Sequence, residues 1–217
     1  MKKFICICLA AIIAISGIVG YFIWKNNQAP VYLPLDYMYA INLDNGGKVK
    51  PGMSREEVEK VFPQPKNGDV YFYDINEDDE KVYSYGGIDF VYNYDDILFR
   101  AEASYAYNKE QEKISRFNYE IGGLKFSDLG NISYEDVIEI FGKPTVDDRV
   151  RVTLAAEPRY FCYIEDDKIR VLTHREYKKI NVDNVDKKRI FNINFYVNHD
   201  LKVDSVELDN YFYMLSF

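Results

Sequence analysis

The sequence contains few residues whose types and spacing could perform chemistry, and the first candidates are acidic. Asp74, Asn76 and Asp78 have the alternating spacing that begins a calcium-binding loop. Such a loop needs a glycine where this sequence has Asp79 and a bidentate glutamate where it has Tyr85. The stretch therefore predicts an acidic turn, at which any calcium binding would be weak and incidental. We expect no metal site and no cofactor.

Cys162 is the second candidate, because a thiolate can act as a nucleophile when a base activates it. His174 and His199 are the two histidines of the sequence, and neither lies in a recognisable motif. Cys162 lies in the apolar run 160–164, which predicts a strand, and a lone strand cysteine is most often a small buried core residue. We therefore predict that the protein is not an enzyme. A hydrolase with an unrecognised site is the least supported alternative.

Tyrosine, with 20 occurrences in 217 residues, is the residue type best suited to a binding role. Its ring offers rigid apolar area and its hydroxyl a polar tip, which favours protein recognition. Residues 70–74 alternate, so Val70 and Phe72 are expected to face a helix while the intervening side chains face away. The alternative is that these tyrosines pack between two halves of the chain. The expected protein-binding residues are Tyr71, Tyr73, Tyr83 and Tyr85.

A short helix with both ends encoded precedes these strands. Ser54 is a typical N-cap, and Glu57 three residues later completes a capping box. Val58 and Phe62 lie on one face of the expected helix, and Pro63 and Pro65 end it. This helix should pack its apolar stripe on the strands that carry the tyrosines.

The same pattern of cap, apolar stripe and proline returns 79 residues later without a gap, from Ser133 to Pro144. Val137 and Phe141 repeat the apolar stripe. Two such helices in register, each followed by strand-like sequence, indicate an internal duplication. The alternative is two unrelated helices that share common capping residues.

Each helix is followed by short strands separated by tight turns, which predicts antiparallel meanders. We therefore expect an α+β fold of two repeats, each a short capped helix packed on an antiparallel β-meander, after an N-terminal transmembrane helix. The expected strands are 70–74, 81–85, 88–94 and 97–107, and then 159–164, 168–173, 189–197 and 201–213. The expected segments are a signal anchor at 1–25, a linker at 26–47, repeat 1 at 48–118 and repeat 2 at 119–217.

The charge of the sequence excludes one class of partner. The formal net charge is −8, and residues 1–25 contain no acid, so the excess of acid lies in the remainder. An acidic body repels phosphate backbones, so we expect no nucleic-acid binding. Residues 174–188 are a charged insertion, which we expect to be a solvated loop. The residues that make this part locally basic are Arg175, Lys178, Lys179, Lys187, Lys188 and Arg189.

The N-terminal residues determine the expected compartment. Lys2 and Lys3 precede an uncharged run at residues 4–24, which is long enough to cross a bilayer as a helix. Because lysines favour the cytoplasmic side, the body is expected outside the cytoplasm. We predict an uncleaved signal anchor, with residues 4–24 in the plasma membrane. The alternative is a secreted protein after signal-peptide cleavage at the small residues near Ser16.

The capped-helix motifs resemble those of a known fold. Residues 52–65 read Gly-Met-Ser-x-x-Glu-Val-x-x-Val-Phe-x-x-Pro, and residues 132–144 read Ile-Ser-x-x-Asp-Val-x-x-Ile-Phe-Gly-Lys-Pro. This layout resembles the tandem-repeat beta-lactamase-inhibitor-protein-like fold and its relatives, the small lipoproteins that assist outer-membrane assembly. The match covers residues 48–107 and 127–213. The chain departs from the family at Pro63, where the family has glycine, and it lacks a lipobox cysteine and a clear first helix before each capped one.

The resemblance implies binding rather than catalysis, through the sheet face that the helices leave uncovered. Together with the N-terminal segment, it leads us to expect an exported, membrane-anchored, non-enzymatic binding protein of the bacterial cell envelope. Its expected partner is another envelope or secreted protein. A structural or stress-related envelope tether is the second interpretation.

Overall fold

The computed structural model describes residues 29–63, 72–75, 80–84, 87–104, 118–147, 157–180 and 186–210, with the backbone alone at 72–75, 80 and 187. The chain divides into two compact units, residues 1–30 and residues 31–217. All the elements described below belong to the second unit. They form a mixed, strand-rich fold with antiparallel sheets, which agrees with the expected α+β class.

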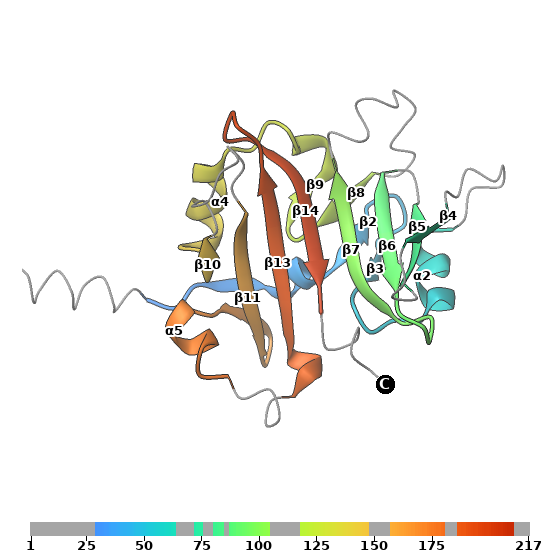
Figure 1. Cartoon of the computed structure of the whole chain (residues 1–217), viewed down its shortest axis with the longest axis horizontal. Coiled ribbons are helices and arrows are strands. Elements are labelled where there is room, and N and C mark those ends of the chain that lie inside the picture. Colours follow the sequence, from blue (N-terminus) through green and yellow to red (C-terminus); the bar gives the residue numbers. More distant parts are fainter. Residues whose placement is uncertain are drawn as a thin grey trace, which may run out of the picture. The chain divides into compact units, whose positions relative to one another are not determined.

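The second unit is built on a ten-stranded antiparallel sheet (Figure 1). Its strands are β1 (Tyr32–Pro34), β4 (Phe72–Ile75), β5 (Glu80–Ser84), β6 (Ile88–Tyr92), β7 (Leu98–Ser104), β10 (Val146–Asp147), β11 (Pro158–Glu165), β12 (Lys168–Val171), β13 (Ile190–Val197) and β14 (Val203–Asp209). Their order is β1-β12-β11-β13-β14-β7-β6-β5-β4, and β10 pairs with β11 beside this path. Because β14 pairs with β7, strands from both expected repeats share one continuous sheet.

A smaller sheet has four strands in the order β3-β2-β8-β9. They are β2 (Ala40–Asn42), β3 (Gly47–Val49), β8 (Tyr119–Ile121) and β9 (Leu124–Lys125). Each half of the chain contributes one hairpin, and the hairpins join where β2 pairs with β8. Ile41 lies opposite Glu120 in this pair, and these positions differ by the same 79 residues as the two capped helices.

The segment expected to be a linker at 26–47 is structured over the part that the structure describes. It contains β1, a short 3₁₀ helix and β2, and the side chains of Leu33, Met38 and Ala40 are buried. We expected a linker because of its prolines, yet Pro34 lies in β1, at the outer edge of the large sheet. Proline is tolerated on an edge strand, because its missing N–H can face away from the ladder.

Both capped helices form where the sequence predicts them. Ser54 accepts the N–H of Glu57 at 3.3 Å and donates its own N–H to the Glu57 carboxylate at 2.8 Å. Ser133 and Asp136 make the same pair of bonds at 3.2 and 2.8 Å. The capping boxes therefore fix both helix starts. The helices are α2 (Arg55–Val61), α4 (Tyr134–Phe141) and α5 (His174–Tyr177), with 3₁₀ turns η1 (Leu35–Met38), η2 (Phe126–Asp128) and η3 (Lys187–Arg189).

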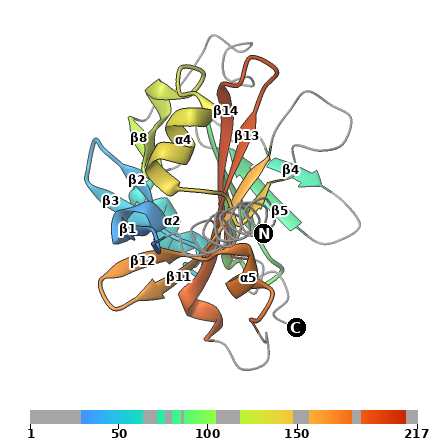
Figure 2. The ribbon, with the colours of Figure 1, turned by 90° about the vertical axis from the view of Figure 1, so that its left-hand side faces the viewer.

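Helices α2 and α4 and the four-stranded sheet lie together on one side of the ten-stranded sheet (Figure 2). The ring centroid of Phe62, at the end of α2, lies 5.2 Å from that of Phe90 on β6. The ring centroid of Phe141 on α4 lies 5.0 Å from that of Phe195 on β13. All four rings are buried, so the predicted apolar stripes form the core.

Two hairpin loops of the large sheet have matching geometry. Asn93, between β6 and β7, accepts the N–H groups two and four residues further on at 3.0 and 2.9 Å. Asn198, between β13 and β14, accepts the corresponding groups at 2.9 and 3.0 Å. Each loop also contains one residue with positive φ, 57° at Asp96 and 58° at Leu201. Both loops therefore depend on an asparagine side chain that replaces backbone hydrogen bonds.

Each loop delivers its second strand to the start of one capped helix. The N–H of Leu98 donates to the carbonyl of Met53 at 2.8 Å, directly before α2. The N–H of Val203 donates to the carbonyl of Ile132 at 2.9 Å, directly before α4. Each helix is thus joined to the sheet by backbone bonds at its N-terminus as well as by its apolar stripe.

Replacing a capping serine with alanine removes one acceptor for a backbone N–H at the helix start. We expect Ser54→Ala and Ser133→Ala each to lower the free energy of unfolding by about 1 kcal/mol, as measured by urea denaturation of residues 26–217. Ser127→Ala is the control, because its hydroxyl donates to the neighbouring Asp128 side chain. That variant should change stability by less than about 0.5 kcal/mol. Unchanged stability in both capping variants would contradict the importance of the boxes.

Candidate functional site

The large sheet has a second face, opposite α2 and α4, which we call the distal face. Strand register assigns residues to it. Val82, Val91 and Arg100 lie opposite one another on β5, β6 and β7, and Asp209 and Asn192 continue the row on β14 and β13. Because neighbours in register point to the same side of a sheet, these five positions mark the distal face.

One expected binding residue, Tyr83, lies on the helix-covered face instead. It pairs with Phe72 and with the buried Phe90, so it points away from the distal face. The Nη1 of Arg55, on α2, donates to the Tyr83 hydroxyl at 2.6 Å, and the Tyr83 and Tyr92 ring centroids lie 5.6 Å apart. The expectation that Tyr83 faces away from the helix is therefore wrong. The pairing of β5 with β4 and β6 puts Tyr83 on the same face of the sheet as Phe72 and Phe90.

The other three expected tyrosines have different outcomes. Tyr71 and Tyr85 lie outside the residues that the structure describes. Position 73 lies opposite Val82, so the backbone register assigns it to the distal face, as expected.

The centre of the distal face is polar rather than aromatic. The Nδ2 of Asn192 donates to Asp209 at 2.8 Å. The Nδ2 of Asn194 donates to Asp209 and to Glu207, each at 2.8 Å. We call these four residues the amide–carboxyl cluster, and all of them are buried. Arg100 approaches it, with Nη1 3.8 Å from a Glu207 oxygen.

The surroundings of Asp209 favour its protonated form. Burial raises the pKa of Asp209 well above its ordinary value, and hydrogen bonding with the adjacent Glu207 and repulsion from it raise the pKa further. The amides of Asn192 and Asn194 oppose this shift, because they stabilise the charged form. Burial and the neighbouring carboxylate both disfavour the charged form of Asp209.

The amide nitrogens of the cluster bond only within it, from β13 to β14, among the residues that the structure describes. Within the described ranges, the Oδ1 atoms of Asn192 and Asn194 are buried and accept no hydrogen bond. Among those same residues there is no group of three or more acidic, histidine or cysteine side chains that could hold a metal ion. The acidic turn predicted after Asp74 falls at 76–79, outside the described residues.

Cys162 is a buried residue of β11 on the helix-covered face. Burial raises the pKa of its thiol far above the ordinary value, so the thiolate is disfavoured. His174 lies on α5, with Nδ1 3.0 Å from the carbonyl oxygen of Thr145, and His199 is exposed in a loop. The thiol therefore matches the predicted small core residue.

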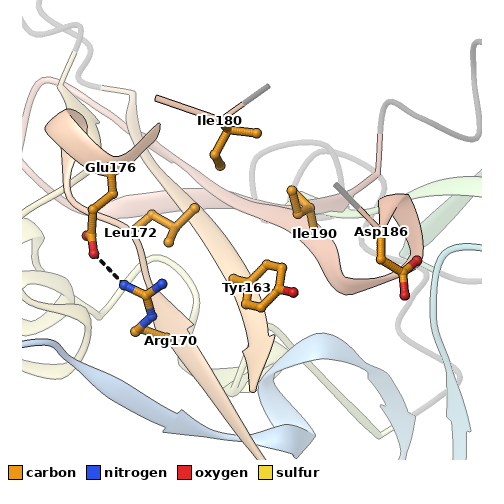
Figure 3. Close-up of a pocket in the computed structure, with 7 residues that line it drawn as sticks. All are labelled: Tyr163, Arg170, Leu172, Glu176, Ile180, Asp186 and Ile190. Carbon is orange, nitrogen blue, oxygen red and sulfur yellow. Dashed lines mark hydrogen bonds and ion pairs between the residues drawn. The ribbon is translucent and has the colours of Figure 1, made fainter. Parts of the chain in front are cut away.

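A cavity of about 290 Å³ opens on the distal face at the β11–β12 end of the sheet (Figure 3). Its floor comes from strand residues, and Glu176 on α5, Ile180 and Asp186 line it from the other side. Tyr163 and Arg170 lie opposite each other on β11 and β12, and Ile190 at the start of β13 lies opposite Tyr163. The residues that line the cavity are Tyr163, Arg170, Leu172, Glu176, Ile180, Asp186 and Ile190.

Arg170 is the best-fixed polar group of this cavity. Its Nε pairs with Glu165 at 2.5 Å and its Nη1 pairs with Glu176, which lies on α5 (Figure 3). The Glu176 carboxylate also closes a capping box with Thr173, accepting its N–H and hydroxyl at 2.8 Å each. These bonds keep the pKa of Glu176 below its ordinary value despite burial, so the ion pair persists at neutral pH.

Aromatic contacts hold α5 over the sheet. The rings of Phe161 and Tyr177 stack with centroids 3.8 Å apart. The guanidinium of Arg189, in η3, lies 5.3 Å from the centroid of the Tyr163 ring. The basic insertion expected as a solvated loop therefore includes two short helical elements that enclose a cavity. The spacing of Thr173 and Glu176 matches the two predicted capping boxes and could have indicated the helix.

Comparisons with known proteins give little further information. The chain matches no protein-family model and no curated protein. Among solved structures, it is similar to a DUF4309 family protein (YjgB) from Bacillus subtilis subsp. subtilis str. 168. The sequence identity is 16%, the TM-score is 0.35, and the match covers 72% of this chain and 78% of that chain. A similarity at this level supports no argument about function.

Within the described ranges, no helix has the length and apolarity needed to cross a bilayer. The predicted span at residues 4–24 lies outside those ranges.

The raised pKa of Asp209 predicts how stability depends on pH. Because the folded-state pKa of Asp209 is raised, the folded state binds more protons than the unfolded state above the ordinary aspartate pKa. The free energy of unfolding should therefore fall as pH rises from about 4 towards the folded-state pKa, by up to about 1.4 kcal/mol per pH unit for one proton. Urea denaturation of residues 26–217 across this range measures the slope.

Asp209→Asn should remove this part of the slope, because the asparagine cannot titrate. Asp200→Asn, at an exposed carboxyl in the loop after β13, is the control and should leave the slope unchanged. A wild-type slope that survives Asp209→Asn would assign the pH dependence to other groups.

Proposed function

We propose that this chain is an exported, membrane-anchored, non-enzymatic binding protein of the bacterial cell envelope, and that it recognises another protein at the cavity on its distal face. The cavity is the observation that supports this most. It combines aliphatic walls with an arginine that is already held by two carboxylates. Protein sites that bind small groups are typically concave and mostly apolar, with a few fixed polar groups.

The surroundings of the cavity favour an anchor residue of a partner over a flat contact. Leu172 and Ile190 are buried, and Tyr163 is half-buried with an apolar ring facing the same space. A partner side chain inserted here would be largely removed from water, which is typical of the residues that dominate interface energies. Tyr73 remains part of the proposal, because its position belongs to the distal face.

Export and anchoring are supported by the sequence alone. Residues 4–24 carry no charge and come directly after Lys2 and Lys3. This arrangement retains the lysines in the cytoplasm and exports the acidic body beyond the apolar run. The cavity would then face the cell envelope, where the expected partner resides.

An internal duplication is part of the proposal, as the resemblance to beta-lactamase-inhibitor-like repeats implies. Each half has a capping box, a phenylalanine contact from helix to sheet, and an asparagine loop whose strand bonds back to the helix start. Register shifts occur at Val91/Tyr92 and at Tyr196/Val197, close to these loops. Two unrelated halves would have little reason to share all four features in the same order.

The duplication predicts matched responses to matched substitutions. Asn93→Ala and Asn198→Ala each remove one side-chain acceptor that serves two backbone N–H groups. We expect each to lower the free energy of unfolding by roughly 1–3 kcal/mol, and the two changes to agree within about a factor of two. Urea denaturation measures both. A large loss for one and none for the other would show that the loops play different roles.

Capture from native envelope extract tests the binding role, with residues 26–217 as bait. The wild-type bait should retain one dominant, saturable partner. Ile180→Trp, which fills the cavity, should reduce capture at least tenfold. Ile140→Trp is the matched control, because Ile140 is exposed on α4, away from the distal face. Equal capture by all three baits would remove the cavity from the proposal.

A further inference from the structure

The cavity lies beside the locally basic segment of an acidic protein. The chain has a formal net charge of −8, whereas residues 174–189 contain six basic and three acidic side chains. Within the described part of this segment, Arg189 lies over the ring of Tyr163, which lines the cavity. The basic side chains of this segment favour anions near this end of the distal face, where Glu176 and Asp186 also line the cavity.

Arg170 is held so that one nitrogen of its guanidinium group, Nη2, stays available. Glu165 and Glu176 occupy Nε and Nη1. Among the residues that the structure describes, Nη2 has no hydrogen-bond partner, and Figure 3 shows it directed toward Leu172. The second oxygen of Glu176 is occupied by Thr173. A guanidinium nitrogen fixed in this way can donate to a carboxylate oxygen with little loss of conformational freedom.

The remaining walls of the cavity favour a ligand that has an apolar body and a hydrogen-bond donor. At the end of the cavity away from Arg170, the Tyr163 hydroxyl points toward the side on which Asp186 lies (Figure 3). Asp186 is an exposed carboxylate that can accept from a ligand N–H. A volume of about 290 Å³ is at the small end of the range for ligand sites. The aliphatic walls between these ends are Leu172, Ile180 and Ile190.

From these features we infer that the cavity binds a small apolar group that carries a carboxylate, with the carboxylate on Arg170. The inference rests on the proposed function and names the chemistry that the site selects. In a protein partner, this chemistry is found in a C-terminal residue with an apolar side chain, whose backbone N–H can donate to Asp186. A free apolar acid has the same carboxylate and apolar body.

Two other ligand classes fit less well. A cation would find the carboxylates of Glu165 and Glu176 already paired with Arg170, and it would meet the charge of Arg189. A phosphate monoester carries more negative charge than a carboxylate, so Glu165 and Glu176 would repel it more strongly. A carboxylate carries a single charge, and one of its oxygens can accept the N–H groups of Nη2.

The test measures the binding of defined probes to the full chain in lipid nanodiscs by calorimetry, with empty nanodiscs as background. The first pair of probes is an N-acetylated pentapeptide that ends in phenylalanine, with either a free C-terminal carboxylate or an amide. The second pair is hydrocinnamate and its amide. We expect at least one acid to bind roughly tenfold or more tightly than its own amide. If the free-acid peptide binds more tightly than its amide, the ligand is the C-terminus of a protein. If only hydrocinnamate binds more tightly than its amide, the ligand is a free acid.

Two variants connect this binding to the cavity. Arg170→Gln should lower the affinity for the acid probe roughly tenfold or more. Arg175→Gln replaces an exposed arginine nearby in the sequence and should change this affinity by no more than about twofold. Because Arg170→Gln also breaks two ion pairs, Ile180→Trp gives a second test. It fills the cavity without removing those pairs and should abolish binding. Thermal melting of each variant verifies that the protein is folded.

The outcomes separate the inference from the proposed function. Equal binding of acids and amides, no binding of any probe, or acid binding that survives both cavity variants overturns the inference. If Ile180→Trp still abolishes capture of an envelope partner in that case, the proposed function stands with a different ligand chemistry. If the acids bind selectively but the wild-type and Ile180→Trp baits capture the same partner equally well, the inference is supported and the role of the cavity in binding a protein partner is overturned.

Discussion

The pairing of β14 with β7 is the contact on which the rest of the structure depends. It joins the strands of both halves into one sheet, so neither meander ends in an exposed edge at the middle of the molecule. It also gives both helices a continuous apolar surface to cover. The same pairing brings Glu207 and Asp209 beside Arg100 and Glu102. The acids of the amide–carboxyl cluster, which lies on β13 and β14, therefore have charged neighbours from the first half.

The polar side chains of the amide–carboxyl cluster are costly to bury, but they make the pairing of β13 with β14 specific. The amide of Asn194 reaches Glu207 and Asp209, which lie two residues apart on β14. A shift of one residue between β13 and β14 would turn these acceptors to the opposite face. Apolar residues at the same positions would tolerate such a shift more easily. The cluster thus exchanges some stability for a fixed register.

Features that depend on a few neighbouring residues were predictable from the sequence, and those that depend on strand register were not. The capping boxes at Ser54 and Ser133 need only four consecutive residues each, so their spacing was enough. The box at Thr173 has the same spacing but starts a helix of four residues with no apolar stripe to confirm it. Tyr83 was assigned to the wrong face of the sheet. Alternation within one strand shows which residues share a face, but not which of the two faces they share with the residues of the next strand. The cavity was not predictable, because its walls come from separate strands and from the segment before β13, which only the folded sheet brings together.

The position of β1 has a mechanical consequence. This strand comes directly after the N-terminal unit, and it pairs with β12 at the sheet edge over three residue pairs, one of which is Tyr32 with Arg170. If the N-terminus is fixed in a membrane, as proposed, a force pulling on the body is transmitted through β1 first. Because only three residue pairs join β1 to β12, β1 separates from the sheet under force before the longer strands behind it do. Tension would therefore act on the strand that bears Arg170, and a ligand held there would resist the same force.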